Sequence, residues 1–464
     1  MLFSSIYFIY YFLPILLALY FIAPDKYRNT VMLIFSLIFY SWGEPVYVFL
    51  MIFSAIFNYS MAIDIHRDSS TGRGGRGTFI FTVVVNLFIL GFFKYYGFLM
   101  DTVNGILGTD IKYTALALPI GISFYTFQAL SYIVDVYRQK VGVQKNLLDF
   151  TLYLALFPQL IAGPVVQYKD IEDQLHNRTI TLSEFGIGAE RFILGLGKKV
   201  LLANNFGAVY SYVSSLSSDD QSVAGLWIGA FAFTLQIYFD FSGYSDMAIG
   251  LGKMFGFTFV ENFNYPYISK SITEFWRRWH ISLSSWFRDY LYLPLGGNRV
   301  RVSRHIINLL IVWALTGMWH GASWNFIIWG MYYGILLILE KYLWGDRINT
   351  LSPRIQSFYT MFFVVIGWVI FSSDSLNEVI GSLQGMFFLS GKSLINSSAL
   401  YLIRTNLVLF AIGILASTPE VIKQYKTLIS RNKVIALIML MLVLVLSTAY
   451  LVYSSYNPFL YFRF

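Results

Sequence analysis

Long, nearly uninterrupted runs of apolar residues limit what this chain can fold into more than any other feature. Most runs are about as long as a helix that crosses a bilayer, and their apolar residues do not alternate with polar ones as in a half-exposed strand. Only 12% of the 464 residues are charged, against about 25% in a soluble domain. Because so few charges cannot cover a water-facing surface, we expect an all-α polytopic membrane protein.

The composition excludes several classes of chemistry. The chain has no cysteine, which rules out thiolate nucleophiles, disulfide bonds, cysteine-based zinc sites and palmitoylation. The sequence contains no phosphate-binding loop, HExxH motif or dinucleotide fingerprint, so ATP-driven transport and zinc proteolysis lose support. The net charge of +8 is better explained by basic cytoplasmic loops than by nucleic acid binding. We therefore expect no nucleic acid partner, no metal and no bound cofactor.

Roughly ten membrane spans are predicted, together with re-entrant and interfacial helices. Loops rich in Lys and Arg alternate with loops that hold few. By the positive-inside rule the basic loops are cytoplasmic, which places both termini outside. No repeat or long linker divides the chain, so we expect one membrane domain over residues 1–464 that ends in an extracytoplasmic tail at 455–464. The predicted spans lie near residues 6–23, 30–42, 46–63, 77–99, 114–134, 192–213, 223–251, 356–371, 400–418 and 434–454.

The segment from Ser271 to Tyr290 predicts one basic amphipathic helix in the plane of the membrane. Ser271 and Glu274 form a capping box, and large apolar residues recur at helical spacing. Arg277 and Arg278 lie on the other side of this helix. These arginines would either grip anionic lipid headgroups or dock an anionic acyl donor through its phosphates, as in coenzyme A.

Two other stretches are expected to enter the membrane and turn back. "LALFPQLIAGPV", residues 154–165, holds helix-breaking prolines, and an ordinary kinked span is its alternative. The run from Ile306 to Lys341 begins and ends beside cytoplasmic charges. Its first arm, Ile306 to Trp319, would cover roughly 21 Å of a hydrocarbon core of about 30 Å. The apex, which carries His320, is therefore expected inside the membrane.

His320 is the strongest candidate for catalysis among the five histidines. An ionisable residue at membrane depth suggests a function, and burial favours the neutral imidazole, which can accept a proton. Ser323 and Asn325 are expected to orient this ring, and Trp319 to contact substrate. The alternative is a structural histidine satisfied by hydrogen bonds. The remaining loop histidines, His66, His176 and His305, are expected to be solvated.

His280 and a pair of aspartates are further candidates. On a continuous helix His280 would lie within about 40° of Trp276, so it would not face water fully. Asp240 and Asp246 lie in "YFDFSGYSDMAIG", where a helix would point them roughly 120° apart, so they are not a paired acid and base. They would either line a water-filled cavity or join a helix-packing network.

Several segments together resemble the membrane-bound O-acyltransferase family, in its bacterial branch that O-acetylates alginate, peptidoglycan and related polymers. The most specific are "ENFNYPYISKSITEFWRRWHISLSSWFRDYLYLPLGGNR" and "GMWHGASWNFIIWG", supported by "FDFSGYSDMAIG", "LPIGISFYTFQALSYIVDVYR" and "FPQLIAGPV". The likeness runs from about residue 110 to the end of the chain. It places the family's near-invariant histidine on His320 and its second motif histidine on His280.

This resemblance implies a protein of the bacterial cytoplasmic membrane whose helices surround a central cavity, with acetyl-coenzyme A as cytoplasmic donor. The acceptor outside would be a partner of the SGNH-hydrolase type, which then modifies the polysaccharide. A sister branch transfers D-alanine to teichoic acids and has a companion peptide ending in Phe-x-Tyr-x-x-Phe, whose tyrosine is thought to carry the acyl group. Here the same pattern, Phe459 to Phe464, ends the chain itself. Tyr461 is therefore a candidate acyl carrier, with an aromatic belt at the membrane surface as the alternative.

Three other functions stay open at the level of sequence. D-alanyl or another small-acyl transfer would use the same site. A transporter is expected to show repeated halves with broken helices at matching positions, which this sequence lacks. A non-enzymatic scaffold would not need a histidine at membrane depth.

Overall fold

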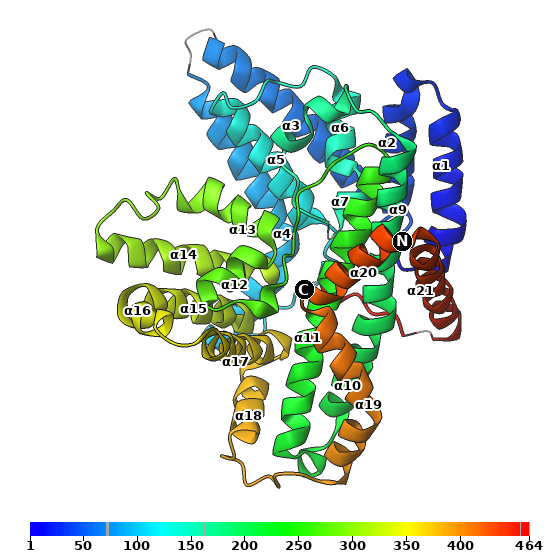
Figure 1. Ribbon diagram of the computed structural model, residues 1–464. Helices are drawn as coiled ribbons and strands as arrows, with labels where there is room; N and C mark the ends of the chain where they lie inside the picture. Colours follow the sequence, from blue (N-terminus) through cyan, green and yellow to red (C-terminus); the bar gives the residue numbers. More distant parts are fainter. Residues whose placement is uncertain (71–73, 115, 162, 455, 464) are drawn as a thin grey trace. The chain divides into compact units, whose positions relative to one another are not determined.

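The computed structural model describes residues 1–70, 74–114, 116–161, 163–454 and 456–463, which form helices and loops without a strand among them. They build two compact units, one of residues 1–192 and 247–260 and the other of residues 193–246 and 261–464. Helices α9 (Leu182–Gly197) and α11 (Val223–Met254) contribute residues to both. The single membrane domain expected for residues 1–464 stays a prediction. Figure 1 shows the order of the helices along the chain.

Eight helices in the described part of the chain are long and apolar enough to cross a membrane, which confirms an all-α, multi-pass membrane protein. Six of the ten predicted spans are among these eight, whereas those predicted near residues 6–23, 30–42, 114–134 and 192–213 are not. The span expected at 114–134 is the helix α5 (Ile122–Tyr137), which has only 16 residues. The hairpin expected to be re-entrant supplies two of the eight. The eight are Tyr47–Ser69, Arg76–Leu107, Val223–Met254, Val302–His320, Trp324–Asn349, Pro353–Ser372, Ser397–Ala416 and Lys433–Tyr453.

The first unit is built around α5, which is buried along almost its whole length and packs against α3 and α4. Gly121 precedes α5 with φ +76°, and a Cβ there would lie 2.8 Å from the Leu160 carbonyl oxygen, so the turn requires glycine. The described residues of 154–165 are all buried. The helices before α9 are α1 (Leu13–Ile22), α2 (Asp25–Ser41), α3 (Tyr47–Ser70), α4 (Arg76–Leu107), α5, α6 (Leu147–Ala155), α7 (Phe157–Leu160) and α8 (Tyr168–Ile171), with a π-helical turn at Phe8–Phe12.

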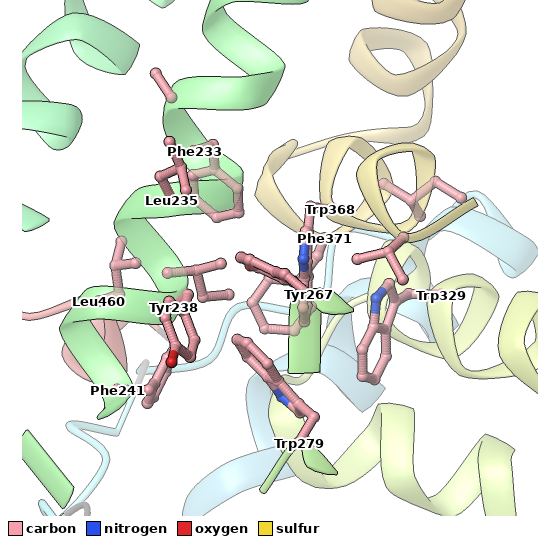
Figure 2. Close-up of a cluster of buried hydrophobic side chains, with 14 of the residues drawn as sticks. Phe233, Leu235, Tyr238, Phe241, Tyr267, Trp279, Trp329, Trp368, Phe371 and Leu460 are labelled. Atoms are coloured by element: carbon pink, nitrogen blue, oxygen red, sulfur yellow. The ribbon is translucent and has the colours of Figure 1, made fainter. Parts of the chain in front are cut away.

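The second unit has an aromatic core. In Figure 2 the rings of Trp279, Trp329, Trp368 and Phe371 gather around Tyr267, and Leu460 from the end of the chain lies beside Tyr238. Besides α9 and α11, the helices of this unit are α10 (Asn204–Ser215), α12 (Ile272–Arg278), α13 (Ile281–Phe287), α14 (Val302–His320), α15 (Trp324–Leu339), α16 (Gly345–Asn349), α17 (Pro353–Ser372), α18 (Leu376–Met386), α19 (Ser397–Ala416), α20 (Glu420–Arg431) and α21 (Lys433–Tyr453). It also contains the π-helical segments η3 (Lys198–Ala203), η6 (Arg288–Tyr292) and η7 (Glu340–Trp344). Short 3₁₀ turns lie at Ser218–Asp220, Pro266–Ile268 and Leu460–Arg463.

Helices α14 and α15 form a hairpin (Figure 1). Its two arms approach each other most closely at glycines. A Cβ on Gly317 would lie 2.2 Å from the Phe326 carbonyl oxygen, and a Cβ on Gly330 would lie 2.2 Å from that of Trp313. Small residues at such crossings let two backbones approach closely. His320 is the last residue of α14, at the tip of this hairpin.

The first arm of the hairpin differs from the prediction. Helix α14 starts at Val302 rather than Ile306 and has 19 residues, which corresponds to roughly 28 Å. Because this arm is nearly as long as a full membrane span, the length of the helix alone no longer predicts that His320 stops inside the membrane. What the structure gives instead is the packing around the tip.

The predicted interfacial helix is also not continuous. It is divided into α12 and α13 at His280, whose φ of +45° lies in the left-handed region. The break is stabilised by the extended segment before it: Ile281 N–H donates to the Asn262 carbonyl at 2.9 Å, and Asn264 N–H to the Arg278 carbonyl at 2.9 Å. Half of the predicted capping box is present: Glu274 N–H donates to the Ser271 hydroxyl at 2.9 Å, whereas the Glu274 carboxylate accepts the backbone N–H of Lys270 at 2.9 Å.

Candidate active site

The imidazole of His320 is half-buried among aromatic rings from three helices. Its centroid lies 5.0 Å from Trp319 and 5.0 Å from Trp329, both edge to face, and 5.4 Å from Phe371. Helices α14, α15 and α17 each contribute one of these rings. The ring of His320 is therefore held in a largely apolar environment at the hairpin tip.

Trp319 brings the two candidate histidines together. The His280 ring lies 6.1 Å from the Trp319 ring, which in turn lies 5.0 Å from His320. His280 is only 6% exposed, and it reaches this position because the helix breaks there. The two histidines thus contact the same indole, although they come from different helices.

The tautomer of His280 follows from its neighbours. Its Nδ1 lies 3.2 Å from Asn262 Oδ1, an atom that also accepts the backbone N–H of Ser282 at 3.2 Å and its hydroxyl at 2.9 Å. A backbone N–H can only donate, so the shared atom is the amide oxygen and His280 Nδ1 must carry the hydrogen. Burial lowers the pKa of His280 to about 3. The ring is therefore neutral, with the lone pair on Nε2.

The end of the chain reaches the same region. The Tyr461 ring is half-buried and lies 6.4 Å from Trp319 and 6.4 Å from Phe241. Phe459 stacks on Tyr244 at 4.7 Å, and Phe459 and Leu460 are buried. Phe464, the last residue of the Phe-x-Tyr-x-x-Phe pattern, lies outside the described residues. Tyr461 and His320 thus contact the same indole from opposite parts of the sequence.

Asp240 and Asp246 form ion pairs with two consecutive lysines that the sequence reasoning missed. Asp240 pairs with Lys199 and Asp246 with Lys198, each at 2.6 Å. Asp240 also accepts the backbone N–H of Leu460 at 2.9 Å. Adjacent lysines within the predicted span 192–213 were the available signal, because charges at membrane depth rarely lack a role.

The remaining candidates lie at two places. Ser323 donates to the Asn325 side-chain oxygen at 2.5 Å, and Asn325 donates to the Ser373 carbonyl at 2.5 Å, which ties the hairpin tip to the end of α17. Arg277 is exposed on α12. Arg278 pairs with Glu274 at 2.8 Å and donates to the Asn264 carbonyl. Of the two, Arg277 therefore presents the more accessible guanidinium.

A group of buried donors around Trp329, the ring that touches His320, was not predicted. The indole N–H groups of Trp276 and Trp329 and the hydroxyl of Tyr333 have no hydrogen-bond partner among the described residues. The three rings touch one another, with centroids 4.8 to 5.6 Å apart. Buried donors without partners are rare in proteins and point to a ligand or water. The sequence could not predict these unpaired donors, because tryptophans at helical spacing usually indicate core packing.

The expectation that His305 is solvated is wrong. It is 2% exposed, its Nε2 lies 2.8 Å from the Tyr292 hydroxyl, and its Nδ1 lies 2.6 Å from the Tyr342 hydroxyl. The early start of α14 places His305 in the first turn of the helix, next to η6 and η7. His66 and His176 are exposed, as predicted.

A cavity of about 200 Å³ lies between α10, α11, α17 and α18. Its wall includes Ser372 and Ser373, which directly follow Phe371, the ring that touches His320. Hydroxyl and carboxylate groups of Tyr210, Ser214 and Glu378 also line it. This cavity has a mixed polar and apolar lining and differs from the predicted central cavity, because neither His320 nor Asp240 lines it.

Comparison with known proteins bears on what this site does. Residues 138–377 match the model of the membrane-bound O-acyltransferase family. The chain is 44% identical over 391 residues to the probable alginate O-acetylase AlgI of Azotobacter vinelandii, with 83% of this chain and 78% of that protein covered. It is 40% identical over 488 residues to the protein of the same name from Pseudomonas putida, with 100% of both covered. It is 35% identical over 433 residues to the peptidoglycan O-acetyltransferase of Helicobacter pylori, covering 86% of this chain and 82% of that protein.

Proposed function

Because the chain belongs to the membrane-bound O-acyltransferase family and is an acyltransferase, we propose that it moves an acetyl group across the cytoplasmic membrane for O-acetylation of a cell-surface polysaccharide. Acetyl-coenzyme A is the cytoplasmic donor, His320 the general base and Tyr461 the acyl carrier. The observation that carries the proposal is the contact of Tyr461 and His320 with the same indole, Trp319.

In the first step the Tyr461 oxygen attacks the thioester carbonyl carbon, and His320 takes the phenolic proton. A phenol with an unperturbed pKa of about 10 needs such a base at neutral pH. Collapse of the tetrahedral intermediate breaks the carbon–sulfur bond, and the proton on His320 passes to the leaving thiolate. The products are coenzyme A and an acetyl ester on Tyr461. Because phenols and thiols have similar pKa values, this ester keeps the acyl group activated for a second transfer.

The buried indole of Trp329 supports stabilisation of the developing oxyanion. It touches His320, and its N–H has no hydrogen-bond partner in the part of the chain that the structure describes. A donor aimed at developing charge in a dry site is among the strongest contributions to acyl transfer. His280, neutral and on the far side of Trp319, would line the path of the donor. Exposed Arg277 fits an anionic donor arriving from the cytoplasm.

In the second step an acceptor hydroxyl outside the membrane attacks the Tyr461 ester and releases the free phenol. The cavity lined by Ser372, Ser373 and Glu378 offers polar groups to such an acceptor. The acceptor belongs to an extracytoplasmic partner of the SGNH-hydrolase type, which passes the acetyl group to the polysaccharide. Both chain termini are extracytoplasmic in this proposal, so Tyr461 lies on the receiving side.

The test is to find the acyl group on the protein. Purified chain is incubated with acetyl-coenzyme A labelled in the acetyl group, digested, and its C-terminal peptide examined by mass spectrometry. Acetyl on Tyr461 in the wild type, but not in His320→Ala, is the expected result. Label on another residue would refute the carrier role, and equal labelling in His320→Ala would refute the base. D-alanine loaded on a carrier protein is the comparison donor, and preference for it would favour D-alanyl transfer.

A further inference from the structure

The last residues of the chain are held by a fully buried ion pair. Lys199 Nζ and Asp240 Oδ1 lie 2.6 Å apart, and their side chains are 2% and 1% exposed. Lys199 lies in η3 and Asp240 in the middle of α11. Removing two charges from water is costly, and such a pair often adds no net stability over apolar residues of similar size. A role other than stability is therefore worth seeking.

Each charge of the pair also binds the backbone of the tail. Lys199 Nζ donates to the carbonyl oxygen of Pro458 and lies 5.8 Å from the centre of the Phe459 ring. Asp240 Oδ2 accepts the N–H of Leu460 at 2.9 Å. The two charges thus hold the main chain on either side of Phe459. Hydrogen bonds to charged groups are about twice as strong as neutral ones, which suits a precise grip.

Neighbouring contacts extend the same grip toward the start of the tail. Asn204 donates to the Asn457 side chain at 3.2 Å, and the hydroxyls of Ser211 and Tyr456 lie 3.1 Å apart. On the other side, Phe459 stacks on Tyr244 of α11. The next aromatic residue is Tyr461, which lies against Trp319. The tail is therefore fixed directly before the residue that reaches the active site.

We propose that Lys199 and Asp240 form a buried clasp that holds the C-terminal tail by its backbone and sets the register in which Tyr461 reaches Trp319. A slip of one residue would move the tyrosine by about 3.4 Å along the tail, which is more than a reacting group tolerates. Lys199 and Asp240 act on catalysis through Tyr461, so they are positioning residues. Only this catalytic consequence depends on the proposed carrier role of Tyr461.

The absence of cysteine makes tail docking directly measurable. Leu460→Cys in the full chain, purified in lipid nanodiscs, places the one thiol at a position that is 7% exposed when the tail is docked. The rate of maleimide labelling then reports release of the tail. Lys199→Met and Asp240→Asn each leave a buried charge unpaired, so the decisive variant is Lys199→Met combined with Asp240→Leu, which removes both charges and preserves folding.

We expect the double variant to keep its thermal stability but to label at least about tenfold faster at the Leu460→Cys site. Labelling at the wild-type rate would overturn the clasp. Lys198→Met, which breaks the neighbouring pair with Asp246, is the matched control and should leave labelling unchanged. Met386→Cys, buried in α18, reports general loosening. An equal rise there would also overturn the clasp, because the effect would not be specific to the tail.

Acyl transfer, measured on the same clasp variants without the reporter cysteine, separates this inference from the proposed function. The clasp predicts faster tail release in the double variant whether or not the protein turns over. If the tail is released and acetyl transfer falls by the same factor as in Tyr461→Phe, both proposals stand. If the tail is released while acetyl transfer continues and Tyr461→Phe is fully active, the clasp stands and the carrier role fails.

Discussion

The rings of Trp319 and Tyr461 lie 6.4 Å apart, although one belongs to the α14–α15 hairpin and the other to the tail of the chain. The same indole contacts His280 at 6.1 Å and His320 at 5.0 Å. A single side chain therefore contacts the proposed base, the histidine that is proposed to line the donor path and the proposed acyl carrier. Trp319 is only 3% exposed, and its burial keeps these three contacts fixed.

The hydroxyl of Tyr461, rather than its ring, is expected to be essential. Tyr461→Phe keeps the contacts with Trp319 and Phe241 but removes the nucleophile, so acetyl transfer should fall below about 1% of wild type with unchanged thermal stability. Tyr456→Phe is the control, because it removes a tail hydroxyl whose hydrogen bond joins Ser211 instead. Radioactive transfer from acetyl-coenzyme A measures both variants. Full activity of Tyr461→Phe would leave the aromatic belt as the explanation of the tail.

His280 should make the folded protein sensitive to acid. Burial lowers its pKa to about 3, whereas the unfolded chain has the ordinary value of about 6.5. Between these values the unfolded state binds a proton that the folded state does not, so stability is fully present above about pH 6.5 and is lost as the pH falls. The loss attributable to this residue is about 1.4 kcal/mol per pH unit.

Denaturant unfolding in detergent at pH 7, 6 and 5 checks this expectation. His280→Asn removes the titrating group, and the slope shared by both proteins cancels in the comparison. The wild type should lose more stability than His280→Asn across this range. Parallel stability curves for the two proteins would mean that the ring is not desolvated as the structure indicates.

The sequence was sufficient to identify the fold class, the family and the helical hairpin that carries His320. It did not predict the break at His280, because no Gly or Pro marks it. The side chain and carbonyl of Asn262, from a segment outside the helix, stabilise the left-handed turn by tertiary hydrogen bonds. For the same reason His305 seemed solvated: its two tyrosine partners lie in η6 and η7, and helical periodicity carries no information about them.

The ion pairs of α11 illustrate a different limit. The angle between Asp240 and Asp246 on a helix was correctly judged too wide for a paired acid and base. Their partners lie on another helical segment, so only the fold shows that Lys199 and Lys198 face them. The hydrogen bond between Asp240 and the backbone of the tail could not be predicted either, because every residue type except proline has the same backbone N–H.

The glycine contact of the hairpin should be required for activity. A methyl group on Gly330 would lie 2.2 Å from the Trp313 carbonyl oxygen, and backbone cannot move aside as a flexible side chain can. Gly330→Ala should therefore separate α14 from α15, destabilise the protein by about 1–3 kcal/mol and displace His320. The temperature of thermal unfolding and the rate of acetyl transfer should both decrease. Gly381→Ala, where a Cβ meets nothing within 4 Å, should lower neither, because alanine is the better helix former at this position in α18.

Substitution of Trp329 distinguishes a role of this side chain in catalysis from a role in packing. Its indole touches His320, and its N–H has no hydrogen-bond partner among the described residues. If this N–H donates to the oxyanion, Trp329→Phe should lower acetyl transfer by about 10- to 100-fold, mainly through kcat, because the bond forms in the transition state. The substitution removes no hydrogen bond among the described residues, so thermal stability should change little beyond the loss of ring volume.

Trp227→Phe provides the opposite case. The N–H of Trp227 donates to the Met386 carbonyl at 3.1 Å, and its loss should reduce stability by about 1 kcal/mol without altering kcat. Steady-state kinetics with acetyl-coenzyme A and thermal unfolding of both variants complete the comparison. A Trp329→Phe protein with unchanged kcat would mean that the buried donor binds only water. The oxyanion would then have to be stabilised by another donor of the cluster, for which Trp276→Phe is the next substitution.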